Sequence, residues 1–275
     1  MDLLTTTEIA LLIGGVMIAA AFAGILAGLL GVGGGIVIVP VLFWVFTFTQ
    51  LDPDIAMPVA VATSLATIIA TAISSARAQH KRGAVDMALV KRWGPWMAAG
   101  ALLGGAVAGL VDAEALMLVF GSVGLLVSVN LARPKTLVLA RNLPKGRAAQ
   151  PALAGTIGTV SAMMGIGGGT LGVPILTACS VPVHRAVGTA AAFGLIIAVP
   201  AVIALIVAGW GVEGRPPLSR GYVNLVAAAL ILPISTALAP RGAQLAHALD
   251  AKWVKRAFAV FLAITSLRML WTALG

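Results

Sequence analysis

Long apolar stretches separated by short polar connections run along the whole chain. Several approach or exceed the roughly 20 residues that a helix needs to cross a bilayer. They are too long and too uniformly apolar for barrel strands, and a lipid-facing helix satisfies its own backbone hydrogen bonds. The pattern predicts an all-α polytopic transmembrane bundle. Its ten segments are expected at 9–30, 36–50, 57–76, 93–111 and 114–131, and at 151–165, 170–180, 185–209, 221–239 and 255–273.

A glycine-rich motif occurs twice. GVGGGIVIVPVL at 31–42 returns as GIGGGTLGVPIL at 165–176, with seven of twelve positions identical at an offset of 134. The tripeptide ATS at 62–64 is paralleled by GTA at 188–190. Internal similarity of this kind indicates a duplicated unit. We therefore expect a first transmembrane repeat at 1–132, a basic linker at 133–150 and a second repeat at 151–275, each with about five hydrophobic segments.

The charged residues predict how the segments are oriented. Loops at 77–92, 133–147 and 241–256, together with Arg185, hold 15 of the 18 basic residues, whereas most acids fall in the other loops. The positive-inside rule places the basic loops in the cytoplasm and both termini outside. The net charge of +9 is then an orientation signal and not a nucleic-acid footprint. The two halves enter from opposite faces, which makes them inverted-topology repeats as in many secondary transporters.

The two glycine clusters are the main candidate chemistry. Each interrupts an apolar run and precedes a new helical stretch, where broken or re-entrant helices are expected. Unpaired N–H groups and the positive end of the helix dipole would face the cluster, a setting that binds anions. Close helix packing is the alternative use of glycine in membranes. A nucleotide site is excluded because no strand precedes the first cluster and no Gly-Lys-Ser/Thr follows it.

Hydroxyl groups within the spans can donate to an anion without a buried formal charge, or can bond back to their own helix. His80 and Arg77 are candidates for a cytoplasmic entrance. One cysteine, Cys179, excludes a multi-thiolate metal site, and neither a cofactor nor a catalytic motif is present. The residues expected at a substrate site are Gly31, Gly33, Gly34, Gly35, Pro40, Thr63, Ser64, Gly165, Gly167, Gly168, Gly169, Thr170, Pro174 and Thr189.

The paired glycine motifs, the stretch at 62–64 and RGAVD at 82–86 resemble the sulfite exporter TauE/SafE family, as do GYV at 221–223 and APRGA at 239–243. The resemblance covers about 10–270. It implies a permease of the bacterial cytoplasmic (inner) membrane that exports sulfite or organosulfur anions, with the glycine motifs near the transport path. The second half departs from the pattern, because Ala190 stands where the first half has Ser64.

The residues and the resemblance together predict a secondary transporter that exports a small anion by alternating access. The expected partners are the anion, the lipid bilayer and a second copy of the chain, without nucleic acid. Two other functions share many of these features, namely an anion channel and a non-transporting scaffold or accessory subunit. An intramembrane enzyme is disfavoured because the spans lack the paired aspartates or His-Glu-x-x-His motif that such chemistry needs.

Overall fold

The computed structural model describes residues 6–30, 33–133, 143–144, 146, 148–248 and 251–275. Within them lie ten helices and a short antiparallel hairpin that pairs Ser219 with Asn224 and Arg220 with Val223. The elements are α1 (Thr6–Leu30), α2 (Gly35–Phe48), α3 (Pro53–Lys81), α4 (Met87–Ala108), α5 (Ala113–Ala132), α6 (Ala149–Met163), α7 (Gly168–Ala178), α8 (Val183–Ala208), β1 (Ser219–Arg220), β2 (Val223–Asn224), α9 (Leu225–Ala248) and α10 (Ala251–Leu274).

The predicted all-α polytopic bundle is confirmed. In the part of the chain that the structure describes, five stretches are long and apolar enough to cross a membrane: Pro53–Lys81, Ala113–Ala132, Val183–Ala208, Leu225–Gly242 and Arg256–Leu274. Many large apolar side chains are exposed on the outside of the bundle, far more than a water-soluble protein tolerates. Examples are Ile18, Leu103, Leu126, Val207, Ile264 and Trp271.

Aspartates begin the three helices that follow polar loops in the first half. Asp52 accepts a hydrogen bond from the Asp54 N–H, and Pro53 occupies the first position of α3. Asp86 caps α4 by accepting from the Leu89 N–H, and Asp112 caps α5 in the same way. Such caps satisfy N–H groups that have no partner within the helix and favour its positive end. They explain why α3 and α4 begin several residues before the apolar runs expected at 57–76 and 93–111.

The helices after the glycine clusters are too short to cross a membrane. At about 1.5 Å per residue, α2 with 14 residues and α7 with 11 residues are about 21 Å and 17 Å long. The hydrocarbon core is about 30 Å thick. Pro40 and Pro174 lie inside these helices without ending them. Each glycine cluster is therefore the turn of a helical hairpin whose second helix is shorter than the hydrocarbon core is thick.

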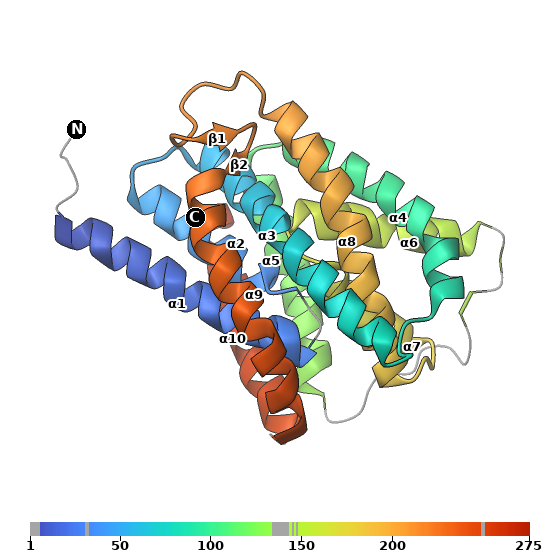
Figure 1. Cartoon of the computed structure of the whole chain (residues 1–275). Helices are drawn as coiled ribbons and strands as arrows, with labels where there is room; N and C mark the ends of the chain where they lie inside the picture. The colour runs from blue at the N-terminus through green and yellow to red at the C-terminus, as the bar shows by residue number, and fades with distance from the viewer. Residues whose placement is uncertain (1–5, 31–32, 134–142, 145, 147, 249–250) are drawn as a thin grey trace.

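The packing of the first five helices is repeated by the last five. Helix α1 packs on α9 and α6 packs on α4, while α2 and α7 lie on α3 and α8. The pairs α3–α8 and α5–α10 join the two halves, with α3 and α8 central in Figure 1. Near one end of this central pair Arg185 is ion-paired with Asp86 at 3.1 Å, and near the other Gly214 approaches Ile55. Helices α3 and α8 consequently run antiparallel, so the halves have opposite orientations.

Individual contacts follow the same symmetry. Residues are equivalent when they differ by 134 between α1–α2 and α6–α7, by 126 between α3 and α8, and by 138 between α4 and α9. The last offset also relates RGAVD at 82–86 to RGYVN at 220–224. Backbones touch at equivalent glycines on both sides of the molecule. The matching contacts are Gly24–Ser235 with Gly158–Met97, and Gly242–Ile25 with Gly104–Thr159.

Candidate functional site

The two glycine clusters meet where the halves join. A Cβ on Gly33 would lie 3.6 Å from the Cα of Gly167, and these residues are equivalent, so the pseudo-two-fold axis passes between them. A Cβ on Gly35 would lie only 2.4 Å from the Gly165 carbonyl oxygen. Only glycine allows the two backbones to approach so closely. We refer to this contact of Gly33–Gly35 with Gly165–Gly167 as the glycine crossing.

Ser64 closes one side of the glycine crossing. Its hydroxyl is fully buried and donates a 2.8 Å hydrogen bond to the Gly165 carbonyl. The equivalent position in α8 is Ala190, which has no hydroxyl to offer. The structure therefore places the expected site residue Ser64 at the glycine crossing, where its proton is already used for a structural bond. The sequence difference between the halves breaks their symmetry at this point.

The backbone conformation also differs between the two clusters. Gly33, Gly34 and Gly165 have positive φ angles of 79°, 75° and 67°, a region that favours glycine. Gly167, the equivalent of Gly33, is instead extended at φ −76°. Helix α2 begins after Gly34 and α7 begins after Gly167, one residue earlier in the equivalent sequence. The two hairpins are thus alike in sequence but differ in conformation.

A small cavity of about 20 Å³ lies against the glycine crossing. Thr71 and Ser75 of α3 line it together with the start of α7, and the Thr71 hydroxyl donates to the carbonyls of Thr67 and Ile68 in its own helix. Within the described residues the N–H groups of Gly168 and Gly169 have no hydrogen-bond acceptor. The dipole of an 11-residue helix makes this end positive. The lining residues are Ala27, Gly33, Ile68, Thr71, Ala72, Ser75, Gly167, Gly168, Gly169, Ala190, Ala191, Gly194 and Ala239.

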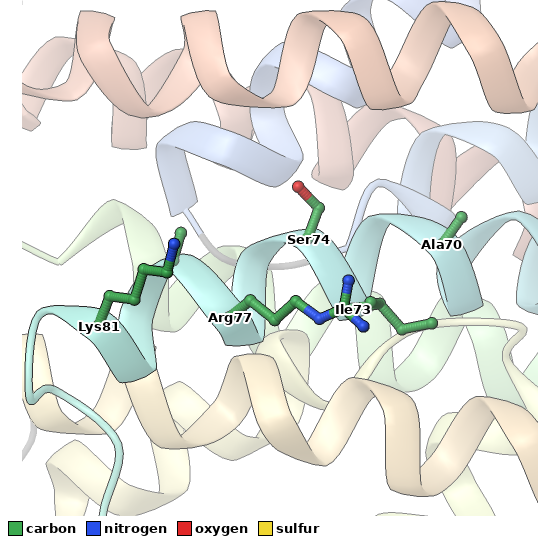
Figure 2. A pocket seen from close by; sticks show the side chains of 6 residues that line it. Ala70, Ile73, Ser74, Arg77 and Lys81 are labelled. Atoms are coloured by element: carbon green, nitrogen blue, oxygen red, sulfur yellow. The ribbon is translucent and has the colours of Figure 1, made fainter.

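A larger, open depression of about 510 Å³ lies along the last three turns of α3 (Figure 2). Its cations are Arg77 and Lys81, and Ser74 adds a hydroxyl. In Figure 2 the Arg77 side chain extends back along the helix towards Ile73, while Lys81 and Ser74 point to one side. No described residue forms an ion pair with either cation. This end of α3 leads into the basic loop at 77–92, for which the positive-inside rule predicts a cytoplasmic position.

The expected site residues Thr63 and Thr189 hold loops in place. The Asn224 N–H donates a 3.0 Å hydrogen bond to the Thr63 hydroxyl, and the Asp86 N–H donates one of 3.0 Å to the Thr189 hydroxyl. Asn224 and Asp86 are themselves equivalent, and each caps the helix that follows. Each threonine therefore anchors one of two equivalent loops by accepting a hydrogen bond from its backbone N–H.

The remaining expected residues occupy different places. The Thr170 hydroxyl in the first turn of α7 is buried without a hydrogen-bond partner among the described residues, and it does not line the cavity. Pro40 and Pro174 lack the N–H that would bond the carbonyl four residues earlier in their helices. Gly31 lies outside the described residues. No group of three or more metal-ligating side chains is found in the described part of the chain.

Sequence reasoning missed Thr71, Ser75 and Lys81. Arg77 was expected at the cytoplasmic entrance and lines the depression, whereas His80 is exposed and is not among its lining residues. The missed residues share a signal: with Ser64, Thr67 and Ser74 they give α3 a run of hydroxyl groups that ends in cations. The equivalent positions in α8 carry Ala190, Phe193, Ile197, Pro200, Ala201 and Val207.

The family model described as sulfite exporter TauE/SafE matches residues 16–269. A "Probable membrane transporter protein" of Haemophilus influenzae is 32% identical over 257 residues, which are 92% of this chain and 96% of that protein. The "Probable membrane transporter protein YunE" of Bacillus subtilis is 30% identical over 172 residues, covering 56% of this chain and 63% of that protein. No solved structure matches the chain.

Proposed function

We propose that this chain, which belongs to the sulfite exporter TauE/SafE family, exports a small anion of the sulfite or organosulfonate class across the bacterial cytoplasmic membrane. Family membership and the similar transporters support a multi-pass membrane transporter. The nature of the anion, its path through the protein and the direction of transport are parts of this proposal. The proposed topology is an inverted pair of repeats at 1–132 and 151–275, joined by a cytoplasmic linker at 133–150, with both termini outside.

The observation that carries the proposal is the cavity at the glycine crossing. The N–H groups of Gly168 and Gly169, which have no acceptor among the described residues, lie in its lining with Ser75 and with Thr71, whose hydroxyl donates to the Thr67 and Ile68 carbonyls. Such groups hydrogen-bond anion oxygens without a buried counter-charge, which would be costly in a membrane interior. No described Asp or Glu lines the cavity to repel an anion. Its lining carries backbone N–H groups and no negative charge, and therefore fits a small anion better than a cation.

The depression on α3 supplies an entrance for this site. Arg77 and Lys81 attract anions from the cytoplasm, and a positively lined cleft raises the local concentration of its ligand. Ala78 lines the depression while Ser75, less than one turn away, lines the small cavity. An anion would pass along α3 between these two spaces. With about 20 Å³ free, the inner cavity has to widen before it holds an oxyanion.

Flux measured with the purified full-length protein in liposomes tests the proposal. Sulfite or a small sulfonate should cross saturably, and an outward gradient of unlabelled anion should drive counterflow of labelled anion. Gly194→Ala is the informative variant, because its methyl group would enter the cavity 3.4 Å from the Ala72 Cβ, an ordinary contact distance. It should remain folded while flux falls at least about tenfold.

Gly15→Ala is the matched control, since a Cβ there meets no atom within 4 Å. Flux without saturation or counterflow would indicate a channel. A protein that shows a cooperative thermal unfolding transition, and is therefore folded, but gives no anion flux would indicate a non-transporting scaffold. Equal flux in Gly194→Ala and wild type would move the site away from the glycine crossing.

A further inference from the structure

The Ser161 hydroxyl on α6 is fully buried and has no hydrogen-bond partner among the described residues. Buried polar groups are almost always paired, and an unpaired one destabilises the conformation that contains it. A serine in a helix often bonds back to the carbonyl one turn earlier, here Ile157, but Ser161 does not. The conformation seen in this structure therefore does not use the hydrogen-bonding capacity of this hydroxyl among the described residues.

The repeat symmetry shows where Ser161 belongs. Its equivalent in the first half is Ala27, which lines the cavity at the glycine crossing. The same offsets applied to the other lining residues outline a second cavity on the opposite side of the Gly33–Gly167 contact. Besides the glycines and Ile68 it would be lined by Ser64, Leu65, Ala101, Ser161, Ile197, Ala198 and Ala201.

This second space is closed in the structure. Ser161, Ile197 and Ala201 are each 0% exposed, whereas Ala27 is 5% and Ala239 is 8% exposed on the open side. Packing of α4 against α8 accounts for the closure.

A Cβ on Gly105 of α4 would lie 2.8 Å from the Ala201 carbonyl oxygen and 3.0 Å from the Ala204 Cβ. The equivalents of Ala201 and Ala204 in α3 are Ser75 and Ala78, and these line open space instead. Equivalent elements of the two halves are thus closely packed on the Ser161 side of the glycine crossing and open on the Ala27 side.

We propose that the two halves exchange these arrangements during transport, and that the Ser161 hydroxyl then binds the anion in an outward-facing cavity. The inference rests on the proposed function and adds a substrate-binding residue to it. At the positions of Arg77 and Lys81, α8 carries Ile203 and Val207, so this helix has no counterpart of the cationic depression. The second cavity would hold the anion with hydroxyl and N–H groups, and the missing cations on α8 favour its release.

Cysteine accessibility tests this inference in membrane vesicles. In a Cys179→Ala background, Ser161→Cys should react with an impermeant, anionic methanethiosulfonate only in right-side-out vesicles. The equivalent variant, Ala27→Cys, should react only in inside-out vesicles. Ala162→Cys, on the same helix and also 0% exposed, is the control and should react at least about ten times more slowly than either.

Modification of Ser161→Cys from the cytoplasmic side would overturn the inference, as would protection equal to that of Ala162→Cys in a variant that still transports. Ser161→Cys could also react from the outside while no tested anion is transported or slows the reaction. That result would uphold the second cavity and refute the proposed substrate.

A second variant examines the hydroxyl itself. Ser161→Ala should raise the half-saturating anion concentration at the external face about three- to tenfold and leave the internal value unchanged. Unchanged external half-saturation would remove Ser161 from the binding site.

Discussion

Replacing Gly35 by alanine should destabilise the glycine crossing and block transport together. The added Cβ would lie 2.4 Å from the Gly165 carbonyl oxygen and 3.0 Å from the Ser64 hydroxyl oxygen. The two hairpins would have to separate by more than about half an ångström, which is overpacking of about 1–3 kcal/mol. The shift would also break the Ser64–Gly165 hydrogen bond, worth about 1 kcal/mol. We expect a total loss of about 2–4 kcal/mol.

Thermal unfolding in detergent and anion flux in liposomes measure the two consequences in the same preparation. Gly35→Ala should unfold at a lower temperature, and its flux should fall at least about tenfold, because about 1.4 kcal/mol already shifts an equilibrium tenfold. Gly15→Ala, in an exposed part of α1, should be as stable as wild type or more stable by about 0.5–1 kcal/mol. A Gly35→Ala protein with wild-type stability and flux would refute the close contact of the two clusters.

Three further predictions concern side chains. Ser64→Ala should lower the unfolding free energy by about 1–3 kcal/mol, measured by denaturant titration, because the buried Gly165 carbonyl loses its donor. Arg77→Gln combined with Lys81→Gln should raise the internal half-saturating anion concentration about three- to tenfold and flatten its salt dependence; an unchanged salt response would exclude the depression as the entrance. Thr63→Val should cost about 1 kcal/mol of stability and leave half-saturation unaltered; the reverse result would indicate direct contact between this hydroxyl and the anion.

The hydrophobic pattern was sufficient to predict every helix, but it underestimated the length of several. The segment expected at 57–76 is part of a helix that runs from Pro53 to Lys81. Its ends are polar, and the Asp52 cap and the basic residues of the last turn stabilise them through the helix dipole. Apolar runs report only the stretch within hydrocarbon, so such ends are invisible to hydropathy.

The site was predictable only in part for a similar reason. Repeated glycines pointed to the crossing because close backbone approach leaves a direct mark on the sequence. The partners of hydroxyl groups leave no such mark: Thr63 bonds a backbone N–H 161 residues away. The similarity of RGAVD at 82–86 to RGYVN at 220–224 would have indicated that this loop is duplicated. No sequence feature indicated that Thr63 and Thr189 hydrogen-bond to the two loops.

Anion binding to the purified protein tests the central claim most directly, that the glycine crossing holds the substrate. Sulfite, small sulfonates and carboxylates should be titrated against wild type and Gly194→Ala while the unfolding temperature is followed, since a ligand that binds the folded state stabilises it. We predict saturable stabilisation of wild type by at least one sulfur oxyanion. Gly194→Ala should be folded but unresponsive, because its methyl group occupies the cavity. Equal stabilisation of both proteins would contradict the account.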